Sequence, residues 1–537
     1  MTRPKATTRP KPPAWRAWTL LLLAGLSGTL LDARPLTAQE MTPARLTAAL
    51  AELDRLAEGT LQRTGVPGLA IAVVHRDAVV YLKGFGVREA GTDQAVDADT
   101  VFQLASVSKP IASTVVAALV GDGVVRWDDH IVDHDPAFQM YDPWVTRELT
   151  LRDMFAHRSG LPDHAGDLLE DLGYDRAEVL HRLRYQRPDS SFRSHYAYTN
   201  FGLTEAAVAA ALAAGQTWED LSAERLYRPL GMTSTSSRFA DYQAAPNRAL
   251  THVLVDGRYT PRYVRDPDAQ SPAGGVSSTV RDLVQWLRLQ LGGGTFEGRQ
   301  LVAAAALEET HRPQIVSNPP EDPATDRAGF YGLGWNVGYD GQGRVRWSHS
   351  GGFAYGAATA VFLVPSAQLG IAVLTNAAPI GVPEAVGVSF LDLALDGQVQ
   401  RDWLAAFGQE FERLNVPPYG RTVDYTRPPA TVSPSQPLDA YVGTYANDLY
   451  GELEVAAENG GLVLRLGPRR MAFPLRHWDR DVFAYQPTGE NAAGLSGVTF
   501  QVEPGPSATL VVVEALDVHG QGTFTRVLPG SVRRPGS

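Results

Sequence analysis

Cysteine is absent from this 537-residue chain. Its absence excludes disulfides, thiolate metal sites, a cysteine nucleophile and a lipid anchor on an N-terminal cysteine. The rest of the composition is that of a folded protein, with 44% apolar and 20% charged residues. Nucleophilic chemistry in this chain must therefore use an oxygen or a nitrogen atom.

Lysine is almost as scarce, with four lysines against 44 arginines. Arginine cannot release its proton, whereas the pKa of a desolvated lysine can fall from about 10.4 to roughly 7 or 8, where the amine serves as a base. Lys5 and Lys11 lie near the N-terminus, which leaves Lys83 and Lys109 as candidates. Lys83 has no serine three residues before it and is interpreted as a solvated strand residue.

Apolar runs of the roughly 20 residues that a membrane helix needs are also missing. A shorter apolar run, 17–31, follows five basic residues and precedes Leu36-Thr37-Ala38, which is the pattern of a secretory signal peptide. We predict a signal peptide over residues 1–38 and a secreted or periplasmic protein with no stable membrane span after cleavage. An uncleaved N-terminal anchor is the alternative.

Positive charge is in deficit, since 48 basic residues oppose 59 acidic ones and leave a formal net charge of −11. Removal of the basic signal peptide would bring the net charge to about −16. Because an acidic surface does not favour nucleic acid or anionic membranes, we expect no nucleic-acid partner.

A first chemical motif, Ser106-Val107-Ser108-Lys109, precedes a predicted helix over residues 111–119. The i to i+3 spacing places the serine and the lysine on one helix face, so that the amine reaches the hydroxyl. Pro110 is tolerated only in a first helical turn, so the helix should begin close to Ser106. The alternative is that Ser106 caps the helix and Lys109 is a solvated first-turn residue.

A second motif, Tyr198-Thr199-Asn200, lies between the polar stretch 188–196 and a predicted helix over 201–214. In an extended stretch alternate residues share a side, so Tyr198 and Asn200 can face one site. A phenol there can relay a proton among nucleophile, lysine and leaving group, and an amide can hold the substrate carbonyl or the lysine. By itself the tripeptide is an ordinary turn sequence.

A third motif, His349-Ser350-Gly351-Gly352, follows the short β-rich run 345–348. We predict an edge strand beside a site. Gly351 has no side chain, so an extended substrate backbone can lie against the strand, and the amide of Gly352 can join that of Ser106 in an oxyanion hole. The alternative is a glycine hairpin turn with a surface histidine.

The three motifs occur together with other characteristic segments, namely 104–110, 154–162, 198–202 and 271–275. In this order and spacing they resemble the serine β-lactamase and penicillin-binding-protein superfamily, particularly its class C β-lactamase, DD-peptidase and esterase branch. The resemblance covers roughly residues 45–395.

The resemblance implies a mixed α/β (α+β) fold, in which helices flank an antiparallel sheet and a mostly helical lobe extends from Lys109 to about Ala240. The site is expected in the cleft between sheet and lobe. Two β-rich runs around a polar turn, 69–74 and 79–85, predict an antiparallel hairpin. The runs 358–364 and 369–375 are further predicted strands.

The resemblance also assigns roles to the motif residues. Ser106 attacks a carbonyl and forms an acyl-enzyme, while Lys109 and Tyr198 transfer protons. The amides of Ser106 and Gly352 form the oxyanion hole. No metal or organic cofactor is implied. The residues expected to position substrate are Asn200, His349, Ser350 and Gly351.

One departure from the family bears on substrate. Many β-lactamases of this superfamily carry Lys-Thr-Gly where this chain has His349-Ser350-Gly351, so the permanent charge that would meet a β-lactam carboxylate is missing. We therefore predict a serine hydrolase acting on small peptide, amide or ester substrates, most readily D-amino-acid peptides of the kind derived from peptidoglycan. The alternatives are a class C-like β-lactamase, a carboxylesterase, or a penicillin-binding sensor that acylates without turnover.

The sequence offers two other candidates for a catalytic site. His130 and His134 have i to i+4 spacing that can bind a metal, but the segment lacks the glutamate of His-Glu-x-x-His. We predict no metal site there. No Gly-x-Ser-x-Gly elbow follows the predicted signal peptide, which argues against an α/β-hydrolase.

The chain is longer than one hydrophobic core usually absorbs, so two or more folded units are expected. We predict a hydrolase domain over 39–414, a proline-rich linker over 415–437 and a small β-rich barrel or sandwich over 438–537. Residues 441–445 resemble the lipocalin-like domain often appended to this family. That domain can cover the mouth of the site, bind substrate or mediate assembly, and the sequence leaves these roles open.

Overall fold

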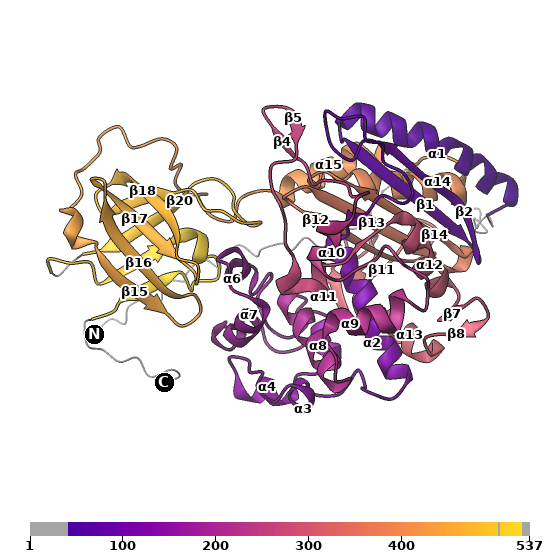
Figure 1. The fold of residues 1–537 in the computed structure, drawn as a ribbon, viewed down its shortest axis with the longest axis horizontal. Coiled ribbons are helices and arrows are strands. Elements are labelled where there is room, and N and C mark those ends of the chain that lie inside the picture. Colours follow the sequence, from indigo (N-terminus) through magenta and orange to yellow (C-terminus); the bar gives the residue numbers. More distant parts are fainter. Residues whose placement is uncertain (1–40, 503–504, 529–537) are drawn as a thin grey trace.

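The computed structural model describes residues 41–502 and 505–528, and the predicted signal peptide lies outside this part of the chain. The described residues form a mixed α/β unit and a separate closed β-barrel, joined by a long connection (Figure 1). None of the described helices is long and apolar enough to cross a membrane.

The larger unit is built on an eight-stranded sheet in the order β2-β1-β14-β13-β12-β11-β10-β9, with every neighbouring pair antiparallel. The predicted hairpin is confirmed, because β1 pairs with β2 around a tight turn. The strands of this sheet are β1 (Gly68–His75), β2 (Ala78–Gly86), β9 (Ile315–Asn318), β10 (Gly329–Tyr331), β11 (Asn336–Tyr339), β12 (Val345–Phe353), β13 (Ala357–Val364) and β14 (Leu369–Thr375).

Helices cover both faces of the sheet, so its central strands are buried on both sides. Successive side chains of β1 point to opposite faces. Ile71 belongs to the layer formed with α1, α14 and α15, and Ala72 belongs to the core on the other face, where α12 packs against β1. These helices are α1 (Pro43–Thr64), α2 (Ser108–Gly121), α12 (Val280–Leu291), α14 (Val382–Asp396) and α15 (Trp403–Leu414).

Short helices form a lobe beside the sheet, as the resemblance implied (Figure 1). The lobe packs around α8, which contacts α5, α11 and α2. Its helices are α3 (Ile131–His134), α4 (Pro143–Glu148), α5 (Leu151–Phe155), α6 (Asp167–Asp171), α7 (Arg176–Arg182), α8 (Asn200–Ala213), α9 (Trp218–Ser222), α10 (Phe239–Ala244), α11 (Ser271–Gly274) and α13 (Ala304–Thr310). Three two-stranded ladders complete the unit, formed by β3 (Phe102–Gln103) with β6 (Ser277–Ser278), β4 (Val253–Val255) with β5 (Arg258–Thr260) and β7 (Thr295–Phe296) with β8 (Arg299–Gln300).

The edge strand predicted at the third motif is wrong, because β12 lies inside the sheet between β11 and β13. The short run 345–348 extends to Phe353, and β13 pairs with it from Trp347 to Phe353. In the described structure β11 pairs with β12 only as far as Ser348. The last five residues of β12 therefore have one strand partner, which leaves their other backbone edge for the site.

The C-terminal unit is a closed barrel of eight antiparallel strands. Alternate side chains fill it, as in β17, where Leu462, Leu464 and Leu466 are buried between half-exposed neighbours. The preceding stretch packs on the barrel through Tyr425 and Trp478, whose rings meet edge to face. The strands are β15 (Gly443–Asn447), β16 (Gly451–Glu458), β17 (Gly461–Leu466), β18 (Met471–Asp479), β19 (Val482–Tyr485), β20 (Ser496–Gln501), β21 (Leu510–Val513) and β22 (Thr523–Arg526).

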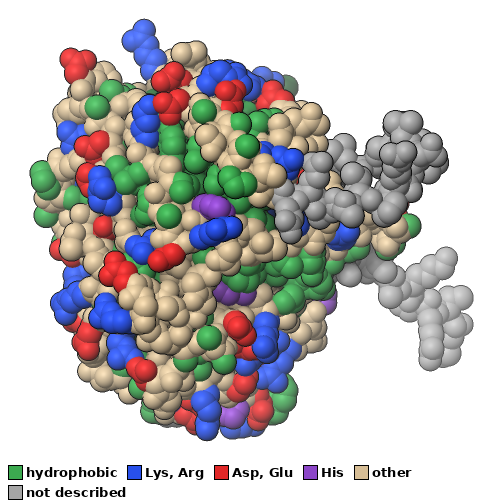
Figure 2. All heavy atoms as spheres, turned by 90° about the vertical axis from the view of Figure 1, so that its right-hand side faces the viewer, with side chains coloured by type: hydrophobic (Ala, Val, Ile, Leu, Met, Phe, Trp, Pro, Cys, Tyr) green, Lys and Arg blue, Asp and Glu red, His purple; other side chains and the backbone are tan. Residues whose placement is uncertain are grey.

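Charge is mixed on the face shown in Figure 2. Acidic and basic side chains are interspersed there, with apolar side chains between them. This face therefore carries no concentration of one sign of charge that would mark a binding surface.

Candidate active site

Ser106 lies in a short turn that leads directly into α2. The turn spans Ala105–Val107, and Ala105 has a φ of 47°, in the left-handed region that costs free energy for any residue with a Cβ. The carbonyl of Leu104 accepts hydrogen bonds from the Thr359 hydroxyl at 2.6 Å and from the Val107 amide at 3.2 Å. The surrounding structure thus holds a strained turn in place and fixes the direction of the Ser106 hydroxyl.

Lys109 is fully buried in the first turn of α2, one turn after Ser106. Its Nζ lies 3.1 Å from Ser106 Oγ, 2.7 Å from Asn200 Oδ1 and 3.0 Å from the carbonyl oxygen of Ala273. Pro110 falls within the same first turn, where its missing N–H leaves no hydrogen bond unmade. Lys109 is therefore a buried partner of Ser106 and not a solvated first-turn residue.

The three contacts of Lys109 suit a base. Burial lowers the pKa of Lys109 to about 7, with the charge of Asp167 opposing the shift. A neutral amine has two N–H donors and one lone pair, and two of its neighbours, Asn200 Oδ1 and the Ala273 carbonyl, can only accept. Its lone pair is then left for the proton of the Ser106 hydroxyl.

Tyr198 lies beside this pair. Its ring is 4.4 Å from Lys109 Nζ, and it lines the same cavity as Ser106, where its buried hydroxyl has no hydrogen-bond partner among the described residues. Its backbone amide donates to Asp163 Oδ1 at 2.5 Å. Burial raises the pKa of Tyr198 well above its ordinary value, so the phenol stays protonated and acts as a proton donor or relay.

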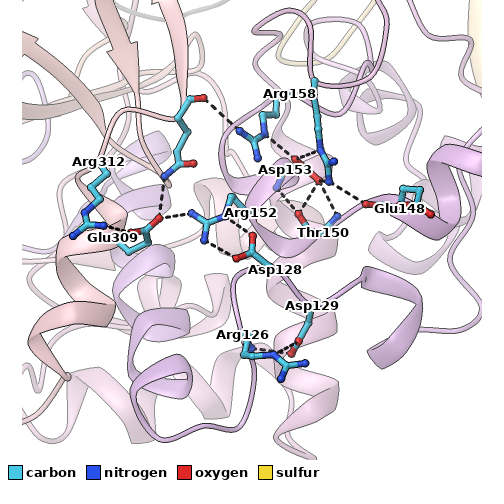
Figure 3. Close-up of polar contacts among 12 residues, drawn as sticks. Arg126, Asp128, Asp129, Glu148, Thr150, Arg152, Asp153, Arg158, Glu309 and Arg312 are labelled. Carbon is cyan, nitrogen blue, oxygen red and sulfur yellow. Dashed lines mark hydrogen bonds and ion pairs between the residues drawn. The ribbon is translucent and has the colours of Figure 1, made fainter.

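A buried carboxylate, Asp153 of α5, fixes the segment that leads to Tyr198 (Figure 3). It accepts hydrogen bonds from Arg158 Nε at 2.7 Å, from Arg193 Nη2 at 2.8 Å and from the Thr150 hydroxyl at 2.7 Å. Burial alone would raise the pKa of Asp153, but these hydrogen bonds hold it below its ordinary value. Arg158 and Arg193 lie at the two ends of a segment that contains α6 and α7, so Asp153 joins these two ends just before Tyr198.

Asn200 is the first residue of α8, so it does not lie in the extended stretch that the sequence suggested. Its amide is fixed at both ends, since Oδ1 accepts from Lys109 and Nδ2 donates to Asp167 Oδ2 at 2.9 Å. Asn200 also lines the cavity in front of Ser106. It therefore positions Lys109 and remains available to a substrate.

Gly351 lies directly against the nucleophile. A Cβ on this residue would be 2.2 Å from the Leu104 carbonyl oxygen and 2.8 Å from the amide nitrogen of Ser106. Only glycine therefore allows β12 to come this close. Gly351 and Gly352 both line the cavity beside Ser106, and an oxyanion hole formed by the amides of Ser106 and Gly352 stays a prediction.

The other two residues of the third motif are placed differently from their predicted substrate contacts. His349 does not line the cavity; its Nε2 lies 2.9 Å from the Tyr331 hydroxyl and its Nδ1 2.7 Å from the Ser350 carbonyl. Since a carbonyl only accepts, Nδ1 carries the proton, and burial together with Lys109 lowers the pKa of His349 to about 3. Ser350 lies at the cavity wall, but its side chain is on the opposite face of β12, beside Glu384.

The cavity in front of Ser106 has a volume of about 60 Å³. Besides motif residues, His164 and Gln270 line it, together with five further charged or polar side chains from distant parts of the chain: Asp167, Glu170, Arg265, Glu490 and Asn491. Three of these, Glu170, Arg265 and Glu490, also line a larger cleft of about 840 Å³. Sequence reasoning missed all five, because no local pattern marks a contact between the lobe, the segment after β5 and a barrel loop.

The histidines of the alternative metal hypothesis pair with separate carboxylates. His134 Nε2 lies 3.2 Å from Asp129, and His130 Nδ1 lies 3.6 Å from Asp133. Within residues 41–502 and 505–528, no group of three or more histidine, cysteine or acidic side chains is arranged to hold a metal ion. The structure thus offers that hypothesis no support.

Comparison with known proteins identifies the family. The family model described as Beta-lactamase matches residues 53–394, and a domain of unknown function (DUF3471) matches residues 427–522. An unguisins hydrolase of Aspergillus campestris is 26% identical over 74% of this chain and 76% of its own length. Penicillin-binding protein 4 of Amycolatopsis lactamdurans is 29% identical over 58% of this chain and 81% of its own length.

Two further similarities agree with this. The D-alanyl-D-alanine-carboxypeptidase/endopeptidase AmpH of Escherichia coli is 23% identical over 61% of this chain and 84% of its own. The octameric penicillin-binding protein homologue from Pyrococcus abyssi has the same fold, with a TM-score of 0.57 and 17% identity over 89% of this chain and 99% of that chain. Because the family match covers well over half of its length, this chain belongs to the beta-lactamase family.

Proposed function

We propose that this protein is an exported serine hydrolase that cleaves amide or ester bonds through an acyl-enzyme on Ser106. Its relatives include hydrolases and penicillin-binding proteins, which supports a hydrolase. The observation that carries the proposal is Lys109, a buried amine with a pKa of about 7 whose lone pair faces Ser106 Oγ at 3.1 Å. Export rests on the predicted signal peptide over residues 1–38.

In acylation, neutral Lys109 takes the proton of Ser106 while Oγ attacks the substrate carbonyl. The protonated amine then has three N–H groups for three acceptors, so the same contacts that orient the lone pair also stabilise the cation. The oxygen of the tetrahedral intermediate receives hydrogen bonds from the amides of Ser106 and Gly352.

Tyr198 completes the proton transfers. Its protonated phenol beside Ser106 donates to the leaving nitrogen or oxygen, and Lys109 resupplies the proton. In deacylation a water takes the place of the leaving group, and the same two residues activate it in the reverse direction.

The substrate class we favour is D-amino-acid peptide, including fragments derived from peptidoglycan. Two observations support it. AmpH is a D-alanyl-D-alanine-carboxypeptidase/endopeptidase, and His349 places a neutral imidazole where many β-lactamases have a lysine. The same absence of a cation disfavours efficient β-lactam hydrolysis. A carboxylesterase and a non-turnover penicillin-binding sensor remain the alternative functions.

The test is turnover of a matched panel by the wild-type protein and by Ser106→Ala. The panel contains nitrocefin, p-nitrophenyl acetate, a D-Ala-D-Ala peptide and D-aminoacyl anilides. We expect an amide substrate to have the largest kcat/KM and Ser106→Ala to be inactive on it. Dominant nitrocefin turnover would identify a β-lactamase, dominant acetate turnover an esterase, and stoichiometric penicillin labelling without turnover a sensor.

A further inference from the structure

A loop of the barrel enters the catalytic cavity. Residues 486–495 connect β19 to β20 and extend toward α6. In Figure 1, barrel loops approach the larger unit on this side. Glu490 and Asn491, from the middle of this loop, line the same cavity as Ser106. The barrel therefore contributes directly to the wall of the proposed active site.

The loop is held by specific contacts and not by loose packing. Asp171 of α6 accepts hydrogen bonds from the amides of Glu490 at 2.8 Å and Asn491 at 3.0 Å, and from the Asn491 side chain at 2.9 Å. Gly489 has a φ of 121°, and a Cβ there would be 2.3 Å from Asp171 Cγ, so glycine is required. On the other side, the amide of Ala354 donates to Glu490 Oε1.

Two carboxylate oxygens on this cavity have no hydrogen-bond donor in the described structure, namely Asp167 Oδ1 and Glu490 Oε2. Asp167 has a side chain only 6% exposed, and its other oxygen is satisfied by His164 and Asn200. Buried acceptors without donors are costly, and a ligand that brings N–H groups relieves that cost.

The nearby guanidinium does not supply these donors. Arg265 is bonded in a fork to Glu170, with Nη1 to Oε1 at 3.1 Å and Nη2 to Oε2 at 2.7 Å. Its Nε lies 3.7 Å from Glu490 Oε2, beyond hydrogen-bond distance. Arg265 thus forms ion pairs with both Glu170 and Glu490 but leaves Glu490 Oε2 without a hydrogen-bond donor, and His164, which is bonded to the other oxygen of Asp167, leaves Asp167 Oδ1 without one in the described structure.

From these contacts we infer that Asp167 and Glu490 form a cation subsite, which binds a primary ammonium group on the acyl part of the substrate, next to the scissile carbonyl. The inference rests on the proposed function of Ser106. An ammonium group has three donors, enough for both free oxygens and one further acceptor. A substrate carboxylate at this position would be repelled.

The size of the cavity agrees with a small aminoacyl group. One water-sized atom needs about 10–15 Å³, so about 60 Å³ holds roughly four to six non-hydrogen atoms. An alanyl group has five. Burial raises the pKa of Glu490 to about 7, with Arg265 opposing the shift, and a bound cation would stabilise its charged form.

The test compares two substrates of one shape, D-alanine p-nitroanilide and isobutyryl p-nitroanilide, in which a methyl group replaces the ammonium. At pH 7 we expect wild type to favour the alanyl substrate by at least tenfold in kcat/KM. Glu490→Gln keeps the shape and the contact to Ala354 but removes the charge. It should lower kcat/KM for the alanyl substrate about 10- to 100-fold and leave the isobutyryl substrate within about twofold.

The matched control is Glu452→Gln, which removes an exposed carboxylate of the same barrel and should change neither substrate. Equal melting temperatures for the two variants and wild type exclude loss of folding as the cause. An alanyl to isobutyryl ratio that stays the same in Glu490→Gln would overturn the subsite.

Binding separates this inference from the proposed function, because it needs no turnover. In Ser106→Ala we expect calorimetry to detect binding of D-alaninamide but not of isobutyramide. Adding Glu490→Gln or Asp167→Asn to this variant should weaken the binding of D-alaninamide at least tenfold. If neither anilide nor any panel substrate is turned over but this difference in binding holds, the hydrolase proposal fails and the subsite stands. If both amides bind alike, the subsite is wrong whatever the enzyme hydrolyses.

Discussion

Lys109 is the residue whose chemistry the account depends on most. Because burial lowers its pKa to about 7, it is protonated below that pH and cannot take the Ser106 proton. We predict that kcat/KM on a neutral ester rises with pH with a midpoint near 7. A pH-rate profile from 5 to 9 measures this, and a rate that is flat from pH 6 to 8 would count against Lys109 as the base.

The same residue predicts the effect of substitution. Lys109→Arg keeps the charge but cannot release its proton, so kcat/KM should fall about 10²- to 10⁴-fold, the usual contribution of a general base. Lys83→Arg is the control, since Lys83 is a half-exposed partner of Asp54 and either cation can fill that role. Activity of Lys109→Arg within threefold of wild type would contradict the mechanism.

At the scale of elements, Asp153 ties α5 to the loop that ends at Tyr198. Asp153→Asn removes a buried charge that pairs with Arg158 and Arg193, so we expect a loss of about 3–5 kcal/mol in the free energy of unfolding and a lower kcat. Asp128→Asn is the control, because its ion pair with Arg152 is largely solvent-exposed on the Asp128 side and should contribute under about 1 kcal/mol. Urea titration measures both.

The pH dependence of this effect has a defined sign. The folded-state pKa of Asp153 lies below its unfolded value of about 3.9, so its stabilisation is complete above that pH and is lost as the pH falls through the folded value. The difference between wild type and Asp153→Asn should therefore shrink below about pH 4. A difference that does not change with pH would show that Asp153 acts by shape alone.

Strands that appear as clear β-rich runs could be predicted from the sequence. The structure confirms the hairpin of β1 and β2 and the strands β13 and β14, close to their predicted bounds. The position of β12 inside the sheet could not be predicted, because β9, β10 and β11 are short, half-buried strands without a strong pattern. The side-chain direction of Ser350 could not be predicted either, since it depends on which face of β12 meets the turn Ala105–Val107.

The same distinction holds for the site. Ser106 and Lys109 lie together because they are one helical turn apart at the start of α2. Asn200 begins α8 and Tyr198 comes two residues before it, which brings both side chains to Lys109. His349 lies outside the cavity because Tyr331, a residue with no sequence signal, accommodates its imidazole.

At the scale of the whole molecule, a loop of the barrel forms part of the wall of the cavity at Ser106. Asp171 holds the loop that carries Glu490, so Asp171→Ala should release it. We predict faster hydrogen exchange confined to residues 486–495, together with a raised KM for amine-bearing substrates. Asp439→Ala, an exposed position on the barrel, is the control. Unchanged exchange in the loop of Asp171→Ala would show that the barrel is held there by other contacts.

The central claim is that Ser106 becomes acylated with Lys109 as its base. The most direct measurement is mass spectrometry of the protein after reaction with a fluorophosphonate, followed by peptide mapping. The account predicts one adduct per chain, located on Ser106, formed with a rate that rises with pH near 7 and absent from Ser106→Ala. An adduct on another residue, or undiminished turnover by Ser106→Ala, would contradict it.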